Sequence, residues 1–368
     1  MRRPDVLIVG GGIIGCALAY YLAKEGVRAT VLERGEIGGE ASGASAGMLA
    51  PLAEAHGPGP FLDLALKSLN MFPVLVEELQ ELTGIDTGYS QCGLLRVSFS
   101  PADDEQLRAR YLWLSSLGMG VELLRGEEAR LLEPRLSPQV TMALLSPQEG
   151  QVEASSMTQA LAEAARRLGA SIEVGAEALS LLHRKGRVMG VRTSRGRLLA
   201  ATVMVAAGAW SGRLLKAVGI PIDTPPVRGQ MVAYRGLVVR HIIWGPEGYL
   251  VPKTRGFTYA GATVERVGFR PHTTRAGLRR LRRMAGHLVP FLARAEVASS
   301  WAGLRPGSPD GLPVIGPLPR WEGLWVATGH FRNGVLLAPI TGQALARWLV
   351  RGEAAGLEPF SPARFFTS

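Results

Sequence analysis

Three glycines near the start of the chain have the spacing that a nucleotide-binding turn requires. Gly10, Gly12 and Gly15 form G-x-G-x-x-G after an apolar run; a predicted helix over 16–24 follows, and Glu33 ends the next apolar run. In such a βαβ unit the glycines permit a tight turn, close approach to a pyrophosphate and close helix packing. The helix N-terminus offers N–H groups to phosphates. A carboxylate at Glu33 accepts hydrogen bonds from both ribose hydroxyls and repels a 2′-phosphate, which predicts FAD or NAD rather than NADP.

The same segment has an alternative interpretation. Residues 6–23 carry no charge and follow Arg2-Arg3, a combination also found in a signal anchor or a twin-arginine leader. Consecutive glycines and an immediate second strand are typical of the nucleotide fold instead. We therefore predict that fold and no membrane span.

Length and composition indicate a two-domain globular protein. The chain has 368 residues, of which 47% are hydrophobic and 20% charged. Two cysteines, Cys16 and Cys92, cannot build a disulfide framework or a metal cluster, so we expect a cytoplasmic protein without a metal site.

The net charge of +10 comes mainly from arginine, and six arginines fall within 270–283. Leu278, Leu281, Ala285 and Leu288 recur at helical spacing, which predicts an amphipathic helix with a basic outer face. Such a face could bind RNA or an anionic membrane. Because no aromatic residues lie between the arginines for base stacking, we favour a solvated face and predict no nucleic-acid partner.

Several segments indicate that a nucleotide domain is interrupted by a second sheet. A run of small residues at 38–49 suggests backbone lying against a ligand, and the strand-to-helix turn at 202–211 places Gly208 at a second close approach. An α/β pattern returns at 324–350. This interleaving favours FAD over NAD, because a flavin needs contacts at both ends. We predict an α/β fold with a Rossmann-like FAD-binding domain (1–84, 147–220 and 303–368) and a discontinuous antiparallel-sheet substrate domain (85–146 and 221–302).

Six motifs, in order along nearly the whole chain, resemble the D-amino-acid oxidase family of FAD-dependent amine oxidases. The last two are the most specific; the six lie at 10–15, 45–49, 207–211, 249–252, 301–307 and 329–339. The resemblance implies oxidation of a small amino acid, with glycine the first choice, in thiamine thiazole synthesis, by a homotetramer. Val264 stands where glycine-oxidising members tend to carry methionine, and 244–248 also differ. Sarcosine, a D-amino acid or electron transfer to a quinone therefore stay open as alternatives.

Arg305 is the strongest candidate for substrate binding. It lies in Gly-Leu-Arg-Pro-Gly, a stiff frame whose planar guanidinium suits a bidentate clamp on a carboxylate, although a structural ion pair is the simpler alternative. The resemblance implies that Tyr249 donates a second hydrogen bond to that carboxylate and that Arg332 lines the substrate face. It further implies hydride transfer from Cα to flavin N5 without a side-chain base. Dioxygen then reoxidises the flavin and yields hydrogen peroxide.

The resemblance also implies the cofactor contacts. Backbone N–H groups of the segment after Gly329 would surround the flavin ring, with His330 fixing the backbone rather than acting as a base. Neither cysteine lies where relatives tether flavin, so FAD should be non-covalent. The expected contacts are His330, Phe331, Arg332, Asn333, Gly334, Val335 and Leu336, together with Gly10, Gly12, Ile13, Ile14, Gly15, Glu33, Arg34, Ala41, Ser42, Ala46, Gly47, Met48, Gly208 and Ala178, whose neighbourhood carries no motif.

Overall fold

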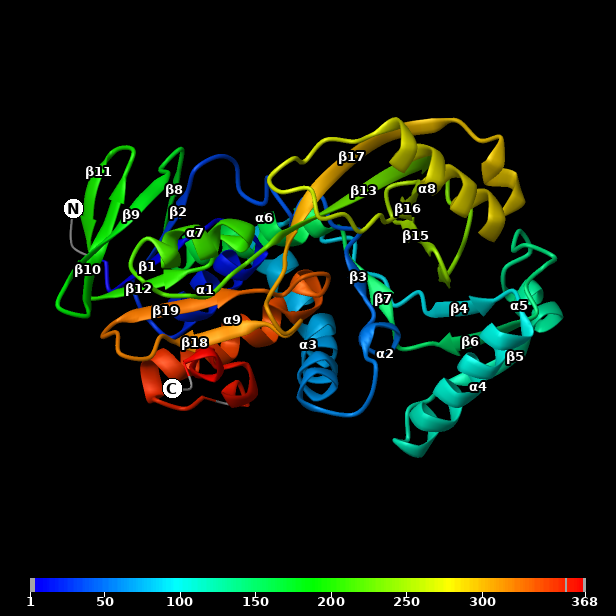
Figure 1. Ribbon diagram of the computed structural model, residues 1–368, viewed down its shortest axis with the longest axis horizontal. Coiled ribbons are helices and arrows are strands. Elements are labelled where there is room, and N and C mark those ends of the chain that lie inside the picture. Colours follow the sequence, from blue (N-terminus) through cyan, green and yellow to red (C-terminus); the bar gives the residue numbers. More distant parts are fainter. Residues whose placement is uncertain (1–3, 355, 367–368) are drawn as a thin grey trace.

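The computed structural model describes residues 4–354 and 356–366, so the Arg2-Arg3 pair of the leader alternative lies outside the described residues. Its nucleotide part is built on a six-stranded sheet in the order β18-β19-β12-β1-β2-β8 (Figure 1). All neighbours are parallel except β18, which runs antiparallel to β19. The strands are β1 (Val6–Val9), β2 (Ala29–Glu33), β8 (Ser171–Val174), β12 (Thr202–Val205), β18 (Val314–Pro317) and β19 (Leu324–Thr328). The predicted Rossmann-like fold is confirmed.

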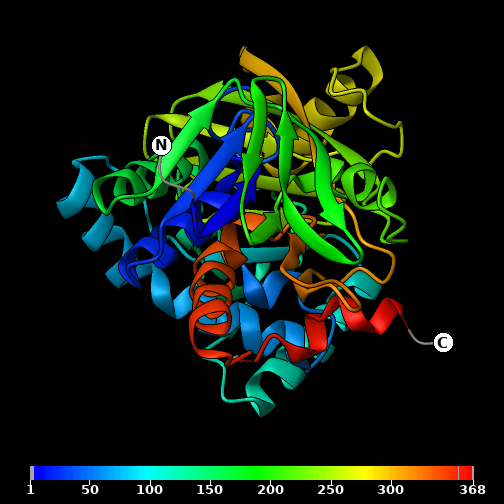
Figure 2. The ribbon, with the colours of Figure 1, turned by 90° about the vertical axis from the view of Figure 1, so that its left-hand side faces the viewer.

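Both faces of this sheet are covered, as an uncharged parallel strand requires. Val6 and Ile8 of β1 pack with the helices on one face, whereas Leu7 and Val9 pack with a three-stranded meander on the other. The helices are α1 (Ile13–Lys24), α3 (Pro60–Thr83), α6 (Ala154–Arg167) and α9 (Gly334–Arg351). The meander is β9 (Ala178–Arg184), β10 (Arg187–Thr193) and β11 (Gly196–Leu199), and it lies on the side of the molecule that faces the viewer in Figure 2.

The second part is an eight-stranded sheet in the order β17-β13-β16-β15-β14-β4-β6-β5. It is antiparallel as predicted, with one difference: β14 and β4 pair in parallel where its two chain segments meet. Its strands are β4 (Leu94–Ser98), β5 (Glu122–Arg125), β6 (Met142–Ser146), β13 (Pro226–Arg235), β14 (Ile242–Gly245), β15 (Gly248–Lys253), β16 (Phe257–Gly261) and β17 (Val297–Pro306).

The predicted basic helix is α8 (Arg275–Leu288), which lies on the eight-stranded sheet. Leu281, Met284 and Leu288 are buried with Val232 and Leu250 of the sheet, while the arginines of 275–283 are exposed. The amphipathic helix is thus confirmed, and the absence of a nucleic-acid partner stays a prediction. Within the described ranges, no helix combines the length and apolar character needed to cross a bilayer.

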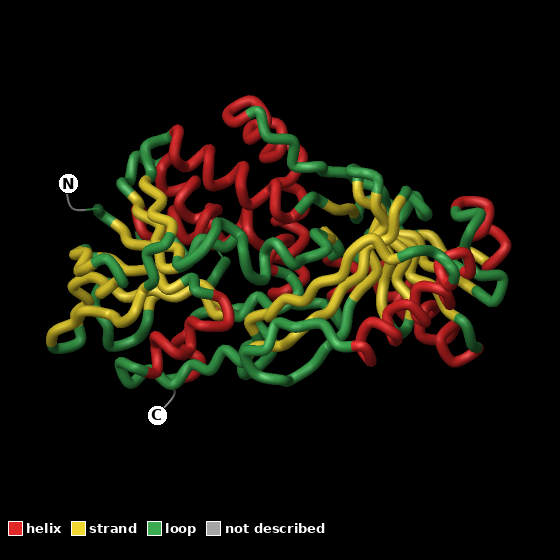
Figure 3. Tube along the Cα trace, turned by 90° about the horizontal axis from the view of Figure 1, so that it is seen from above, coloured by secondary structure: helices red, strands yellow, loops and turns green. Residues whose placement is uncertain are grey.

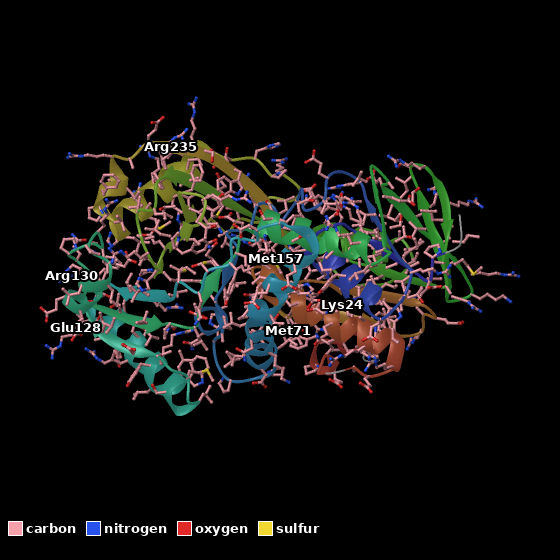
Figure 4. The ribbon with its side chains drawn as sticks, turned by 180° about the vertical axis from the view of Figure 1, so that it is seen from behind. Lys24, Met71, Glu128, Arg130, Met157 and Arg235 are labelled. Atoms are coloured by element: carbon pink, nitrogen blue, oxygen red, sulfur yellow. The ribbon has the colours of Figure 1, made fainter. Side chains whose placement is uncertain are left out.

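The two sheets lie at opposite ends of the molecule, with loops between them (Figure 3). Glu128 and Arg130 of α5 (Gly126–Leu132) mark the far end of the second part, away from Lys24 at the end of α1 (Figure 4). The strands of each sheet fall within the predicted domain segments apart from the last residues of β17, and the exact boundaries stay a prediction. The remaining elements are α2 (Pro51–Glu54), α4 (Pro101–Ser116), α5 (Gly126–Leu132), α7 (Ser211–Lys216), β3 (Met48–Leu49), β7 (Gly150–Gln151) and four 3-10 turns, η1 (Gly208–Trp210), η2 (Pro290–Ala293), η3 (Glu358–Phe360) and η4 (Pro362–Phe365).

Candidate active site

A long cleft joins the nucleotide turn to the second sheet. Its volume is about 390 Å³, within the range of cofactor and ligand sites, about 300–1,000 Å³. Most of the predicted site residues line it: Gly10, Gly12, Ile13, Ile14, Glu33, Arg34, Ala41, Ser42, Ala46, Met48, Ala178, Gly208, Tyr249, Arg305, His330, Phe331, Arg332, Gly334 and Val335. Motifs that are distant in sequence therefore meet around one space.

The three glycines of the turn have different roles in the structure. A Cβ on Gly10 would lie 2.4 Å from the carbonyl oxygen of Ala206, and one on Gly15 would lie 2.0 Å from that of Gly10. Both glycines are therefore required for packing. A Cβ on Gly12 would meet only the Ser42 hydroxyl, at 3.2 Å, so the space beside Gly12 belongs to the cleft. The first turn of α1 carries no acidic residue, which suits it to a pyrophosphate.

Glu33 is held at the edge of the cleft by backbone groups. Its two carboxylate oxygens accept hydrogen bonds from the N–H groups of Gly11 and Gly35, each at 2.8 Å. Next to it, the guanidinium of Arg34 lies 3.9 Å from the ring centre of Trp210 and pairs with Glu40. A fixed acid beside a flat aromatic and guanidinium surface fits the ribose and adenine end of a dinucleotide.

The small-residue loop forms the middle of the cleft. Ser42 accepts a hydrogen bond from the Ile13 N–H at 2.9 Å, which joins the loop to the start of α1. Gly47 has a φ of +75°, and a Cβ there would lie 1.9 Å from the carbonyl oxygen of Val152. The backbone of Gly47 thus packs directly on the backbone of Val152. Its neighbours Ala46 and Met48 face the cleft.

Four predicted cofactor contacts are not among the residues that line the described cleft: Gly15, Gly47, Asn333 and Leu336. Gly15 and Gly47 provide the close packing described above. The Asn333 backbone closes a turn by donating to the His330 carbonyl at 2.9 Å, and Leu336 is buried in the core.

His330 begins the segment that enters α9. Its ring is buried, and its Nε2 lies 3.2 Å from the Thr341 hydroxyl oxygen. Burial lowers the pKa of His330 to about 3, so the ring is neutral at pH 7. This geometry supports the predicted role in fixing the backbone.

Arg305 and Tyr249 meet at the far end of the cleft. The Arg305 Nη1 donates to the carbonyl oxygen of Thr263 at 3.0 Å, which leaves further guanidinium N–H donors for a ligand. A Cβ on Gly229 would lie 2.3 Å from the guanidinium nitrogens, so only glycine gives Arg305 its place across β13. Burial raises the pKa of Tyr249 and lowers that of Arg305; the phenol therefore keeps the proton that it donates.

Arg332 is oriented by an acid that the sequence motifs did not reveal. Its Nε lies 3.1 Å from a Glu54 carboxylate oxygen, and its guanidinium lies 5.0 Å from the Trp244 ring centre. Arg96 approaches the same ring at 5.7 Å. Burial raises the pKa of Glu54, and the neighbouring Arg332 and Arg305 oppose that rise. The guanidinium groups of Arg305 and Arg332 both line the cleft, and this positive charge favours an anionic ligand.

A second buried acid holds the one-turn helix that carries Glu54. Glu149 Oε1 accepts hydrogen bonds from the N–H groups of Leu52 (2.7 Å) and Ala53 (3.0 Å). Within the described part of the chain, its Oε2 has no hydrogen-bond partner. Burial raises the pKa of Glu149 to about 8, from a usual value near 4.5. Burial therefore favours the protonated form of Glu149 in the folded protein.

We expect Glu149 to make folding stability fall with rising pH. Between about pH 4.5 and pH 8 the Glu149 carboxyl group loses its proton in the unfolded chain but keeps it in the folded chain. The contribution of this group to the free energy of unfolding is therefore complete below pH 4.5 and is lost as the pH rises toward 8. Glu149→Gln should raise the unfolding free energy at pH 8 by roughly 1–4 kcal/mol and change it little at about pH 4.5. Urea unfolding at both values measures this. An equal effect at both would mean that Glu149 does not titrate in this window.

The comparisons with known proteins agree with this geometry. The model of the FAD dependent oxidoreductase family matches residues 5–348, and the chain belongs to that family. It is an oxidoreductase, its cofactor is FAD, and the resemblance to the D-amino-acid oxidase family is confirmed.

Several relatives are similar over nearly the whole chain. A glycine oxidase of Geobacillus kaustophilus is 38% identical over 369 residues, which cover 99% of this chain and 97% of the relative. The crystal structure of glycine oxidase from Geobacillus kaustophilus superposes with a TM-score of 0.94 at 37% identity, covering 99% of both chains. The bifunctional protein ThiO/ThiG of Synechocystis sp. is 38% identical, but the chain spans only 54% of that protein.

Proposed function

We propose that this protein oxidises a small amino acid, with glycine as the main substrate. Glycine, water and dioxygen would give glyoxylate, ammonia and hydrogen peroxide, with an imine as the intermediate that water hydrolyses. The observation that carries the proposal is that a half-buried Arg305 and a buried Tyr249 lie together at one end of a cleft whose other end is a nucleotide turn. The relatives named glycine oxidase support it.

The residues at this end would bind and orient the amino acid. Arg305 would hold its carboxylate with two parallel N–H groups, and Tyr249 would donate a third hydrogen bond. Arg332, fixed by Glu54, would close the side of the site. Bound FAD would supply the acceptor for the hydride, which carries both electrons of the oxidation. Because His330 is neutral and turned to Thr341, the amine would have to bind without its extra proton.

This requirement sets the expected pH dependence. kcat/KM should rise toward alkaline pH, because a larger fraction of the substrate then carries a neutral amine. The position of the rise should move when amino acids with different amine pKa values are compared. Steady-state assays across pH measure it. A rise that stays at one pH for all substrates would show that an enzyme group is titrating instead.

We expect the flavin to be bound without a covalent link. Neither Cys16 nor Cys92 lines the described cleft, and burial raises the pKa of their thiols to about 12 and about 11. Such thiols are poor nucleophiles. Acid precipitation of the yellow protein should leave all flavin in the supernatant. Flavin in the pellet would mean that another side chain forms the link.

An oxygen-electrode screen of glycine, sarcosine, D-alanine and D-proline tests the substrate. The proposal predicts the highest kcat/KM with glycine; a better rate with another of these would make the protein a sarcosine or D-amino-acid oxidase. Reduction of a quinone without oxygen uptake would indicate a dehydrogenase.

We further propose that the protein acts in the cytoplasm as a homotetramer that serves thiamine thiazole synthesis. The similarity to the ThiO/ThiG proteins supports the pathway. Light scattering after gel filtration tests the tetramer.

A further inference from the structure

A buried lysine lies directly behind the loop that lines the cleft. Lys253 ends β15, four residues after Tyr249, so both side chains project from the same face of the strand. That face packs against the loop, since Tyr249 and Val251 share a hydrophobic cluster with Ala46 and Met48. The Lys253 side chain is only 1% exposed. An ammonium group this deep in the protein needs a specific set of partners.

Each N–H of the Lys253 ammonium has an acceptor within reach. Nζ donates to the carbonyl oxygens of Val152 at 2.7 Å and of Ala46 at 3.1 Å, and to the side-chain oxygen of Gln151. The Glu153 carboxylate lies 3.7 Å away. Two of these acceptors are main-chain groups of different segments, so one ammonium joins the cleft loop to the segment behind it.

The two joined segments form the wall at the middle of the cleft. The Val152 N–H donates to the Gly47 carbonyl at 2.9 Å, and β3 pairs with β7 next to it. Ala46 and Met48 face the cleft, whereas Lys253 does not line it. A buried charge of this kind is a weak source of overall stability, because desolvation opposes the interactions that it makes. The hydrogen bonds of Lys253 fix the local conformation of the cleft wall, where its ammonium group bonds the carbonyl groups of Ala46 and Val152.

We propose that Lys253 is a positioning residue for the cofactor: its ammonium fixes the carbonyl groups of Ala46 and Val152 and so keeps the wall at 46–48 in the conformation that binds FAD. The removal of Nζ leaves three acceptors without a donor, and the wall then relaxes away from its place. The prediction concerns FAD affinity and does not depend on which amino acid is oxidised.

FAD titration of the apoprotein, followed by quenching of flavin fluorescence, tests this role without any substrate. Lys253→Met should raise the Kd for FAD about 10- to 100-fold, the effect expected from loss of hydrogen bonds to a charged group. Lys253→Arg restores a buried cation and should bring the Kd most of the way back. Arg255→Met is the matched control, because Arg255 lies two residues after Lys253 and its guanidinium donates a hydrogen bond to the Ser156 hydroxyl instead of the Ala46 carbonyl. The Kd of this variant for FAD should equal that of the wild type.

Three results would overturn the proposal. The first is a wild-type Kd in Lys253→Met with only a lower unfolding temperature. The second is an equal loss of affinity in Arg255→Met, and the third is an arginine variant no better than the methionine variant. Lys253→Gln, a second neutral variant, should also bind FAD weakly. If neither neutral variant folds as apoprotein, Lys253 serves the fold as a whole and the proposal is wrong.

Discussion

Arg305→Ala should lower kcat/KM for every oxidised amino acid by roughly 30-fold to several thousand-fold. The change leaves a substrate carboxylate unmatched in a buried site, which costs about 2–5 kcal/mol, and each 1.4 kcal/mol is about a factor of ten. The loss of kcat/KM should be large because the Arg305 guanidinium occupies a fixed position beside Gly229, where any larger residue would collide with it. Steady-state kinetics with glycine measure it.

Two companion variants show whether the effect comes from the guanidinium fork. Arg305→Lys should recover only part of the rate, because an ammonium group cannot present two parallel donors. Tyr249→Phe removes one hydrogen bond to a charged group and should cost less, about 1.5–3 kcal/mol. FAD content should stay normal in all three variants. Near-normal kcat/KM in Arg305→Ala would show that the carboxylate is bound elsewhere.

Gly12→Val should give a folded but colourless protein. The new side chain would extend into the cleft, where the protein itself offers little obstruction: the nearest atom is the Ser42 hydroxyl oxygen, at 3.2 Å from the Cβ. The pyrophosphate of FAD needs that space. Flavin absorbance per purified chain and the far-UV circular dichroism spectrum measure the two properties together.

Gly15→Val is the matched control for this glycine, because its Cβ would lie 2.0 Å from the Gly10 carbonyl oxygen. It should lower stability as well as flavin content, since α1 can no longer pack on β1. A Gly12→Val protein that retained full flavin would contradict the placement of the pyrophosphate.

The parts of the structure that were predictable from the sequence are those set by local pattern. The apolar run of β1, the glycine spacing and the closing acid Glu33 identified the nucleotide turn without any distant contact. The start of α1 is less local: Gly12 supplies an extended residue before the helix, so α1 begins at Ile13 rather than at 16.

The rest of the site depends on contacts that only the fold creates. Glu54 and Arg96 lie in segments without a motif and meet Arg332 and Trp244 through the packing of α2 against the second sheet. A motif also marks a segment rather than the side that faces a ligand, which explains why Asn333 and Leu336 do not line the cleft. Gly229 could have been recognised from the sequence, because a glycine inside a long strand often marks a place where another group lies close to the backbone.

The most direct test of the account is the flavin colour during one anaerobic turnover. One equivalent of glycine added to the yellow protein without oxygen should bleach the flavin absorption band and produce one glyoxylate per flavin after imine hydrolysis. Admission of air should restore the band and release one hydrogen peroxide per flavin. A flavin that stays oxidised with glycine, sarcosine and every small D-amino acid would contradict the central claim that this cleft brings an amino acid to FAD.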